Sequence, residues 1–166
     1  MKRLTPNTGI QNRVLAGALL LLLATPAFAV LGDNAASVLS DQARMKGTLR
    51  SVDHRAYVMH EITMSSGSKV REFVSPAGAV FAVTWEGQFP PNFRQLLGPY
   101  YEQAQRAAAQ QKAAPAAEQS PLVRRGPVVI NTPGVVFVQT GHTRSFHGQA
   151  YIPQLMPQGV QASDIR

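Results

Sequence analysis

The polar residues best suited to chemistry lie close together near the C-terminal end of the sequence. His142, Arg144, His147 and Tyr151 all fall within the stretch that begins at Gly141. An arginine can bind a carboxylate or phosphate through two parallel hydrogen bonds, and histidine and tyrosine add further polar contacts. These four residues are therefore candidate binding residues. The alternative interpretation is a polar hairpin end whose side chains satisfy exposed backbone groups.

Strand geometry decides which of these side chains can act together. In a continuous strand, successive side chains point to opposite sides. That alternation predicts His142, Arg144 and Phe146 on one side and His147 on the other. The hairpin around His142 and Arg144 is therefore the predicted contact surface.

Familiar catalytic patterns are few. The sequence has no GxSxG motif, and it has no cysteine, which excludes a thiol nucleophile and a CxxC redox centre. Paired carboxylates of the glycosidase type are conceivable from Glu61, Glu72 and Glu86, because each lies on a different predicted strand. We interpret these three glutamates instead as exposed charges on the solvent face. Arg71 and Glu72 cannot share one face of a strand, although either can pair with a residue across the sheet.

Metal binding needs converging ligands, and the histidines do not show the usual spacings. His142 and His147 are five residues apart rather than the four of a helical pair, and the sequence contains no HExxH motif. His54 and His60 are six residues apart. Without cysteine there is also no thiolate zinc site. The sequence therefore predicts neither a metal nor another cofactor.

Residues 1–29 have the pattern of a cleaved export signal. A positively charged N-terminus precedes the uncharged apolar stretch Val14–Ala24. The sequence Ala27-Phe28-Ala29 supplies a small-residue cleavage pattern, which predicts cleavage after Ala29. The apolar stretch is shorter than the roughly 20 residues of a membrane-spanning helix, so no stable membrane anchor is expected after cleavage. We expect a periplasmic or secreted protein.

Part of the chain's charge belongs to this N-terminal segment. The full sequence carries a formal net charge of +7, with 16 basic and 9 acidic residues. Three of the basic residues lie in the predicted signal. The remaining cations are scattered, without the basic stripe and interleaved aromatics that nucleic-acid binding requires. Another envelope protein is the partner class left open, and the oligomeric state is not predicted.

Hydrophobic periodicity predicts a single α+β domain over residues 30–166. The chain from Tyr57 to Glu86 contains three apolar runs separated by two turn signals, which predicts an antiparallel meander with Ala79–Trp85 as its central strand. A short helix over Asp33–Lys46 precedes the meander, and a middle helix begins after Asn92. Together with C-terminal hairpins, the meander predicts an antiparallel sheet of about five to six strands.

Two regions are less regular in sequence. Thr48–Arg55 is polar and fits either a loop or a first edge strand. Residues 103–127 are rich in Ala, Gln and Pro, which predicts a flexible segment that begins as a poorly anchored helix. The predicted C-terminal strands are Val128–Ile130, Val135–Thr140 and Ser145–Ile152.

Four segments of the chain resemble one family of small exported proteobacterial proteins. They read SVLSDQARMKG, VREFVSPAGAVFAVTWEG, PNFRQLLGPYY and GHTRSFHGQAYIPQLMPQGV, in this order. That family is catalogued only as a domain of unknown function, and the resemblance spans nearly all of the predicted exported part. It implies export and a single domain, but it implies no activity.

These observations leave three functional hypotheses. The first is a non-enzymatic periplasmic accessory or binding protein that uses the hairpin from Gly141 to Tyr151 as its contact surface. The second is a small periplasmic hydrolase or carbohydrate-active enzyme that acts through residues such as Glu72 or His142. The third is an envelope assembly factor in which the Ala- and Gln-rich helix docks a partner.

Overall fold

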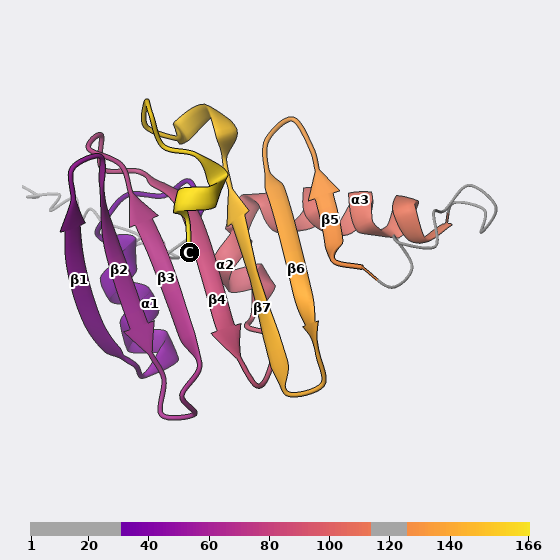
Figure 1. Ribbon diagram of the computed structural model, residues 1–166, viewed down its shortest axis with the longest axis horizontal. Coiled ribbons are helices and arrows are strands. Elements are labelled where there is room, and N and C mark those ends of the chain that lie inside the picture. The colour runs from indigo at the N-terminus through magenta and orange to yellow at the C-terminus, as the bar shows by residue number, and fades with distance from the viewer. Residues whose placement is uncertain (1–30, 114–125) are drawn as a thin grey trace, which may run out of the picture.

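The computed structural model describes residues 31–113 and 126–166 of the chain. These residues form an antiparallel sheet of seven strands in the order β1-β2-β3-β4-β7-β6-β5 (Figure 1). The predicted α+β class with an antiparallel sheet is confirmed. The strands are β1 (Thr48–His54), β2 (Tyr57–Thr63), β3 (Lys69–Val74), β4 (Val80–Gly87), β5 (Val128–Asn131), β6 (Val136–His142) and β7 (Ser145–Tyr151).

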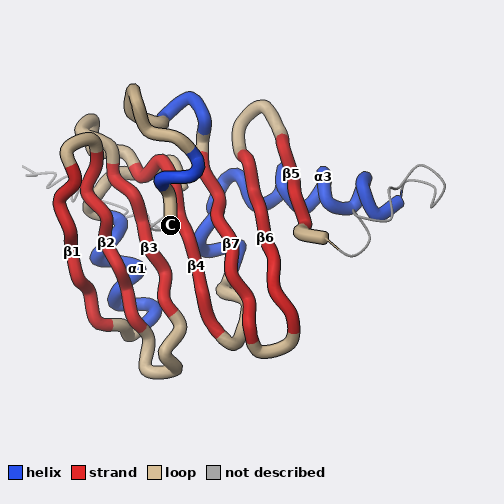
Figure 2. Tube along the Cα trace, in the orientation of Figure 1, coloured by secondary structure: helices blue, strands red, loops and turns tan. Residues whose placement is uncertain are grey.

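Helices cover one face of this sheet, which we call the helix face (Figure 2). Helix α1 (Ser37–Met45) lies behind β1 to β3, whereas a helical segment lies behind the other half of the sheet. That segment consists of α2 (Phe93–Leu97), η1 (Gly98–Tyr100) and α3 (Tyr101–Ala113). We call the opposite face the open face. The C-terminal segment, with η2 (Pro153–Leu155) and η3 (Ala162–Asp164), crosses the upper part of the open face in Figure 1.

The predicted meander forms β2, β3 and β4, joined by turns whose glycines permit the required backbone. Gly67 and Gly78 have φ angles of 80° and 83°, in the left-handed region that glycine adopts without steric cost. Strand β4 lies in the middle of the sheet, and its first six residues are all buried. An apolar strand is expected where both faces of the sheet are covered. The prediction of Ala79–Trp85 as a central strand is confirmed.

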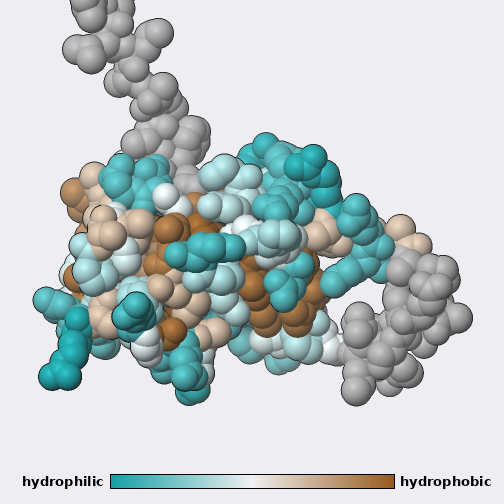
Figure 3. Space-filling model, turned by 90° about the horizontal axis from the view of Figure 1, so that it is seen from above, coloured by the Kyte–Doolittle hydropathy of each residue, from teal (hydrophilic) through white to brown (hydrophobic). Residues whose placement is uncertain are grey.

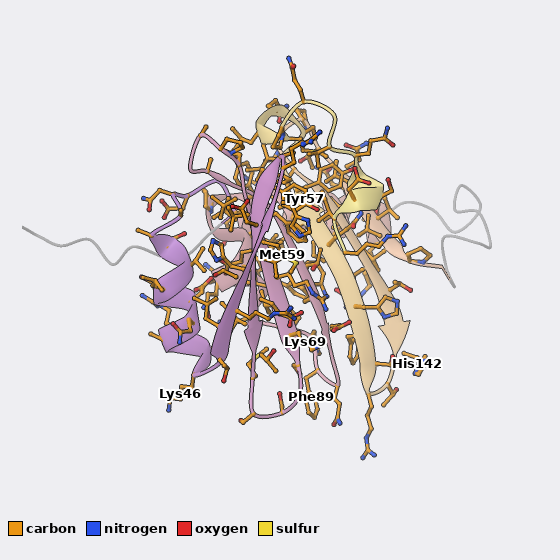
Figure 4. The ribbon with its side chains drawn as sticks, turned by 60° about the vertical axis from the view of Figure 1, so that its left-hand side comes forward. Lys46, Tyr57, Met59, Lys69, Phe89 and His142 are labelled. Atoms are coloured by element: carbon orange, nitrogen blue, oxygen red, sulfur yellow. The ribbon has the colours of Figure 1, made fainter. Side chains whose placement is uncertain are left out.

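The larger hydrophobic core lies between the sheet and the helices. Trp85 is at its centre, with ring centroids 5.2 Å from Phe93 and 5.3 Å from Phe137. Aromatic rings at such separations stabilise a core beyond the area that they bury. Phe89 takes no part in this core, because it is 69% exposed in the loop after β4 (Figure 4).

A smaller core lies on the open face, under the C-terminal segment. Phe73, Phe81 and Ile165 are almost fully buried there, and Tyr57 and Met59 pack against them (Figure 4). Ile165 anchors the C-terminal segment because its side chain fills space between the sheet and that segment. The upper half of the open face is therefore covered by hydrophobic packing, which leaves the lower half to polar side chains.

The segment Thr48–Arg55, for which sequence allowed a loop or an edge strand, contains β1. All seven residues of β1 pair with β2, and this pairing raises the number of strands above the predicted five to six. The polar pattern of β1 reflects its position at the sheet edge, where both faces are only partly covered. Edge strands commonly carry charged residues, which discourage pairing with another chain.

Helix α1 also differs in detail from its prediction. It begins at Ser37 rather than Asp33, because the side chain of Asn34 holds a turn by accepting a hydrogen bond from the Ala36 amide at 2.9 Å. The left-handed residue at its end is Lys46, with φ of 51°, and the glycine that ordinarily takes such a position follows it as Gly47. Gly47 is needed for another reason, since a Cβ atom there would lie 2.5 Å from Ile62 Cγ2.

The other edge of the sheet is β5, a strand of four residues. Helix α3 reaches this edge, where the Gln111 side chain donates a hydrogen bond to the Val129 carbonyl at 2.9 Å. The predicted flexible segment at residues 103–127 thus includes a helix that ends at Ala113. Its remaining part falls mostly outside the described residues.

The predicted export signal also lies outside the described residues. Within the described ranges, no helix is both long and apolar enough to cross a membrane. Seen from above, the hydrophobic side chains at the surface form patches separated by hydrophilic ones (Figure 3).

Candidate functional site

The hairpin that carries the predicted binding residues joins β6 to β7. His142 pairs with Ser145, so the turn consists of only Thr143 and Arg144, and Arg144 has a φ of 65°. The chain reverses at this turn and does not continue as one strand. By the register of β6 and β7, His142 and His147 therefore lie on the same face of the sheet. The prediction that placed them on opposite sides is wrong.

The structure brings together two of the four predicted binding residues. Arg144 and His147 both line a cleft of about 420 Å³ at the lower end of the open face, together with Glu86 and the turn between β2 and β3. His142 is exposed at the lower end of β6 (Figure 4). Tyr151 lies at the other end of β7, where it packs against the smaller core. The four side chains therefore do not form one site.

A second hollow, of about 300 Å³, lies on the uncovered part of the open face, and we call it the open-face groove. It continues from the cleft, because Glu86 and His147 line both. Its floor is formed by β3, β4, β7 and β6, and the end of the C-terminal segment closes one side. The residues that line it are Arg71, Thr84, Trp85, Glu86, Val138, Thr140, His147, Gly148, Gln149, Ile165 and Arg166.

Charged residues on β2, β3 and β4 form an ion-pair network beside this groove. The Arg71 guanidinium lies 2.8 Å from Glu61 Oε2 through Nε and 3.1 Å from Glu86 Oε1 through Nη2. Lys69 Nζ lies 3.6 Å from the same Glu86 oxygen. Two cations thus balance two carboxylates across three neighbouring strands. The predicted pairing of Arg71 across the sheet is confirmed, and it fixes the guanidinium in one orientation.

One hydroxyl group in the groove has no hydrogen-bond partner among the described residues. The Thr84 hydroxyl is buried and makes no hydrogen bond to any described residue. Thr84 lies between Arg71 on β3 and Gln149 on β7 in the sheet register. A buried hydroxyl without a hydrogen bond is unfavourable, so such a group marks a position where a further polar partner would be stabilising.

The helix face contains an unusual acidic pair. Asp41 on α1 and Glu72 on β3 are each 1% exposed. Gln95, at the start of the middle helical segment, donates a hydrogen bond to Asp41 Oδ1 at 2.6 Å. Burial, and next the negative charge of Asp41, raise the pKa of Glu72 to about 9. Burial also raises the pKa of Asp41, against the opposing effect of the Gln95 hydrogen bond.

The sequence interpretation of Glu72 as an exposed charge is therefore wrong. Glu61 and Glu86 lie on the open face with Arg71. Glu72 is the next residue after Arg71 on the same strand, so its side chain points to the opposite face, toward the helices. The signal that would have found the buried pair was the helical pattern of α1. Asp41 falls three residues after the buried Val38, on the side that faces the sheet.

A serine and a histidine form a second close polar contact. Ser51 Oγ on β1 lies 2.7 Å from His60 Nδ1 on β2, and the strand register places Glu72 on the other side of His60. The order serine, histidine, carboxylate is that of a nucleophilic triad. Burial lowers the pKa of His60, which keeps the imidazole neutral. However, Glu72 makes no hydrogen bond to His60, because its side chain is hydrogen-bonded to Asp41 instead.

A further serine motif lies in the turn before β3. Ser66 and Lys69 have the SxxK spacing, which brings a serine and a lysine together when both lie on one face of a helix. Here the spacing spans a turn and a strand start. Ser66 Oγ instead lies 3.1 Å from Ser68 Oγ, and Lys69 pairs with Glu86. The geometry therefore separates the two groups.

Metal ligands do not gather in the part of the chain that the structure describes. No three of its histidine, aspartate or glutamate side chains come close enough to hold an ion. A third hollow, of about 210 Å³, lies between α3 and strands β5 and β6, and its lining is mostly apolar. The polar chemistry of the described residues is thus concentrated in the cleft, the groove and the buried acidic pair.

Comparison with known proteins places the chain in a family. A family model described as "protein of unknown function (DUF2844)" matches residues 27–165. Because the match covers most of the sequence, the chain belongs to this family. No curated protein and no solved structure shows a significant similarity to it. The resemblance noted from sequence motifs is therefore confirmed at the level of a domain of unknown function.

Proposed function

We propose that the protein is an exported, non-enzymatic binding protein whose open-face groove contacts a polar partner in the bacterial envelope. The observation that carries this proposal is the groove itself, with charged and neutral polar groups held on four adjacent strands. Binding sites on rigid strands hold their side chains in place before the ligand arrives, which lowers the entropic cost of binding. The export signal predicted from residues 1–29 supports the envelope location.

The chemistry of the groove favours a partner that carries both carboxylate and amide groups, such as an exposed loop of another envelope protein. Arg71 is committed to Glu61 and Glu86, so the network is nearly neutral and does not select a highly charged ligand. Gln149 offers an amide that can donate and accept hydrogen bonds, and beside it in the sheet Thr84 holds a buried hydroxyl without a partner among the described residues. Arg166 adds a cation at the rim that can bind a carboxylate.

The geometry gives little support to catalysis. In a working triad, an ionised carboxylate orients the histidine and stabilises its positive charge. Glu72 has a pKa of about 9, so at neutral pH it is uncharged and cannot supply that stabilisation. Ser51 and His60 also line none of the hollows described above. Binding is therefore the better explanation of the polar sites.

The proposal can be tested by site-specific photo-crosslinking. A photoreactive residue at Gln149 reports on the groove, and one at Val52 on β1 reports on a distant part of the same face. Both proteins are incubated with an envelope extract from the producing bacterium. We expect a discrete adduct from position 149 that is reduced at least about tenfold by His147→Ala, the loss expected when one well-placed contact of about 1.4 kcal/mol is removed.

The matched control for His147→Ala is His142→Ala, because both histidines are exposed on the same two-strand hairpin and only His147 lines the groove. His142→Ala should leave the adduct unchanged. Circular dichroism confirms that both variants are folded. Equal labelling from positions 149 and 52, or equal loss with both histidine variants, would contradict the proposal.

A small hydrolase is the second candidate, and it is favoured by one observation, the 2.7 Å contact between Ser51 and His60. A panel of chromogenic esters and glycosides tests it directly. Turnover that disappears in Ser51→Ala but persists in Ser40→Ala would establish the enzyme and replace the binding proposal. Absence of turnover at all pH values from 5 to 9 would leave binding as the supported function.

A further inference from the structure

The buried acidic pair joins three elements of the helix face. Asp41 comes from α1, Glu72 from β3 in the middle of the sheet, and Gln95 from α2. Both carboxyl groups are 1% exposed. Gln95 donates a hydrogen bond to Asp41 Oδ1, and the side chains of Asp41 and Glu72 are hydrogen-bonded to each other. The pair lies on the opposite face of the sheet from the open-face groove, so it takes no part in the proposed binding site.

The pair lacks hydrogen-bond donors for its remaining oxygens. Asp41 Oδ2, Glu72 Oε1 and Glu72 Oε2 are all buried, and no described N–H or O–H group outside the pair donates a hydrogen bond to them. Ionised carboxylates only accept hydrogen bonds, and two negative charges in one dry site repel each other strongly. A single proton on the pair changes both conditions, because it removes one charge and supplies one donor.

The groups around the pair do not compensate for a second negative charge. On α1, Arg44 attracts Asp41 but does not outweigh the effect of burial. On β2, His60 is the cross-strand neighbour of Glu72, and burial favours its neutral form. On β4, the cross-strand neighbour is the apolar Val83, and α2 contributes the uncharged Gln95.

We propose that Asp41 and Glu72 form a proton-dependent fastener that holds helix α1 against the sheet. In the protonated state the two carboxyl groups share the proton, and α1 stays docked. When the proton is lost at alkaline pH, two adjacent buried charges repel each other. The least costly response is for α1 to move away from β3, because β3 is fixed by strands on both sides, whereas α1 is attached at its ends.

The direction of the pKa shift sets the pH range of this effect. The pKa of Glu72 rises from an ordinary value of 4.5 to about 9 on folding, so the folded state binds the proton more tightly than the unfolded chain. The stabilisation from this proton is complete below pH 4.5 and is lost progressively as the pH rises toward 9. Alkaline pH therefore weakens the attachment of α1.

The first test measures urea unfolding of the full-length protein at pH values between 5 and 9. Each molecule that unfolds releases the one proton bound by the pair. We therefore expect the equilibrium constant for unfolding to rise by up to about tenfold per pH unit through the effect of the pair. Glu72→Gln should remove most of this slope, because the amide does not titrate and keeps the side-chain shape. Glu86→Gln, a partly exposed glutamate on the neighbouring strand, is the matched control and should keep the slope.

The second test needs no substitution. Carbon-13 NMR of the glutamate carboxyl groups follows Glu72 in the wild-type protein, and hydrogen exchange follows the amides of α1. We expect one carboxyl resonance to titrate several pH units above the others and α1 to lose protection at the same pH. Titration of every glutamate near pH 4.5, or a slope in Glu72→Gln equal to that of Glu86→Gln, would overturn the proposal.

Discussion

Strand β3 shows two opposite ways of accommodating a carboxylate within one sheet. On the open face, Arg71 holds the Glu61 and Glu86 carboxylates in ion pairs at 2.8 and 3.1 Å. On the helix face, the next residue, Glu72, is buried without a cation, and its charge is suppressed by a bound proton. Neighbouring residues on one strand thus meet unlike surroundings because side chains alternate between the two faces.

The comparison teaches that a neighbouring cation, rather than residue type or burial alone, separates these acids. Glu61 is also largely buried, with a side chain 14% exposed, but Arg71 Nε lies 2.8 Å from its carboxylate. Glu72 has the same chemistry and lacks only the cation. Paired charges can fix the side chains of a ligand-binding surface. A buried protonated acid instead makes the packing of the element that carries it depend on pH.

The largest expected effect comes from exchanging the two neighbours. The double variant R71E/E72R places three carboxylates side by side on the open face and a guanidinium on the helix face, where the space fits a smaller side chain. We expect a loss of more than about 4 kcal/mol in the free energy of unfolding, or failure to fold. Urea unfolding monitored by Trp85 fluorescence measures it.

The control for that exchange is the exposed ion pair between Arg94 and Glu102, whose side chains are 70% and 55% exposed. Exchanging these two residues keeps the pair and buries no charge. The free energy of unfolding should change by no more than about 0.5 kcal/mol. A similar loss in both exchanges would show that the faces of β3 do not differ as described.

A smaller effect is expected when only the open-face network is broken. Arg71→Ala leaves Glu61 and Glu86 without their shared cation, which should cost about 2 kcal/mol because Glu61 is mostly buried. Lys69→Ala removes a longer and more exposed contact, and should cost less than about 0.5 kcal/mol. Thermal unfolding of both variants at pH 7 tests the difference, and equal losses would contradict the central role of Arg71.

The smallest effect concerns the acidic limb of the pH profile. Burial lowers the pKa of His60, so the unfolded chain binds this proton more tightly than the folded protein. Stability is therefore complete above the ordinary value of 6.5 and is lost as the pH falls below it. His60→Gln should flatten the profile below pH 6.5 while the alkaline decline due to Glu72 persists. A profile that is unchanged on the acid side would show that His60 does not contribute.

The fold was more predictable from sequence than the sites. Turn residues and apolar runs located β2, β3 and β4, because glycine and proline placement is a local property of the chain. β1 was ambiguous because an edge strand carries the polar pattern of a loop. The sequence alone did not show which end of β7 the C-terminal segment covers. Tyr151 lies at the covered end, in the smaller core, whereas His147 lies at the open end and lines the groove.

The buried acidic pair was missed for a related reason. Alternation correctly separated Glu72 from Arg71, but it did not show which of the two faces the helices would cover. Ile62, Val70 and Val83 share the face of Glu72, whereas Met59 and Phe73 occupy the other, so both faces contain apolar residues. The buried Glu72 could be distinguished from Glu61 and Glu86 only once the position of α1 was known.

The hydrogen bond from Gln111 to the Val129 carbonyl also limits edge-to-edge association between molecules of this protein. β5 ends the sheet, and an unpaired strand edge attracts the strands of other chains. A helix side chain occupies one of its carbonyls, so α3 shields part of this border. Shortening α3 by a single turn would expose that border, and sheets from separate molecules would then have a place to join.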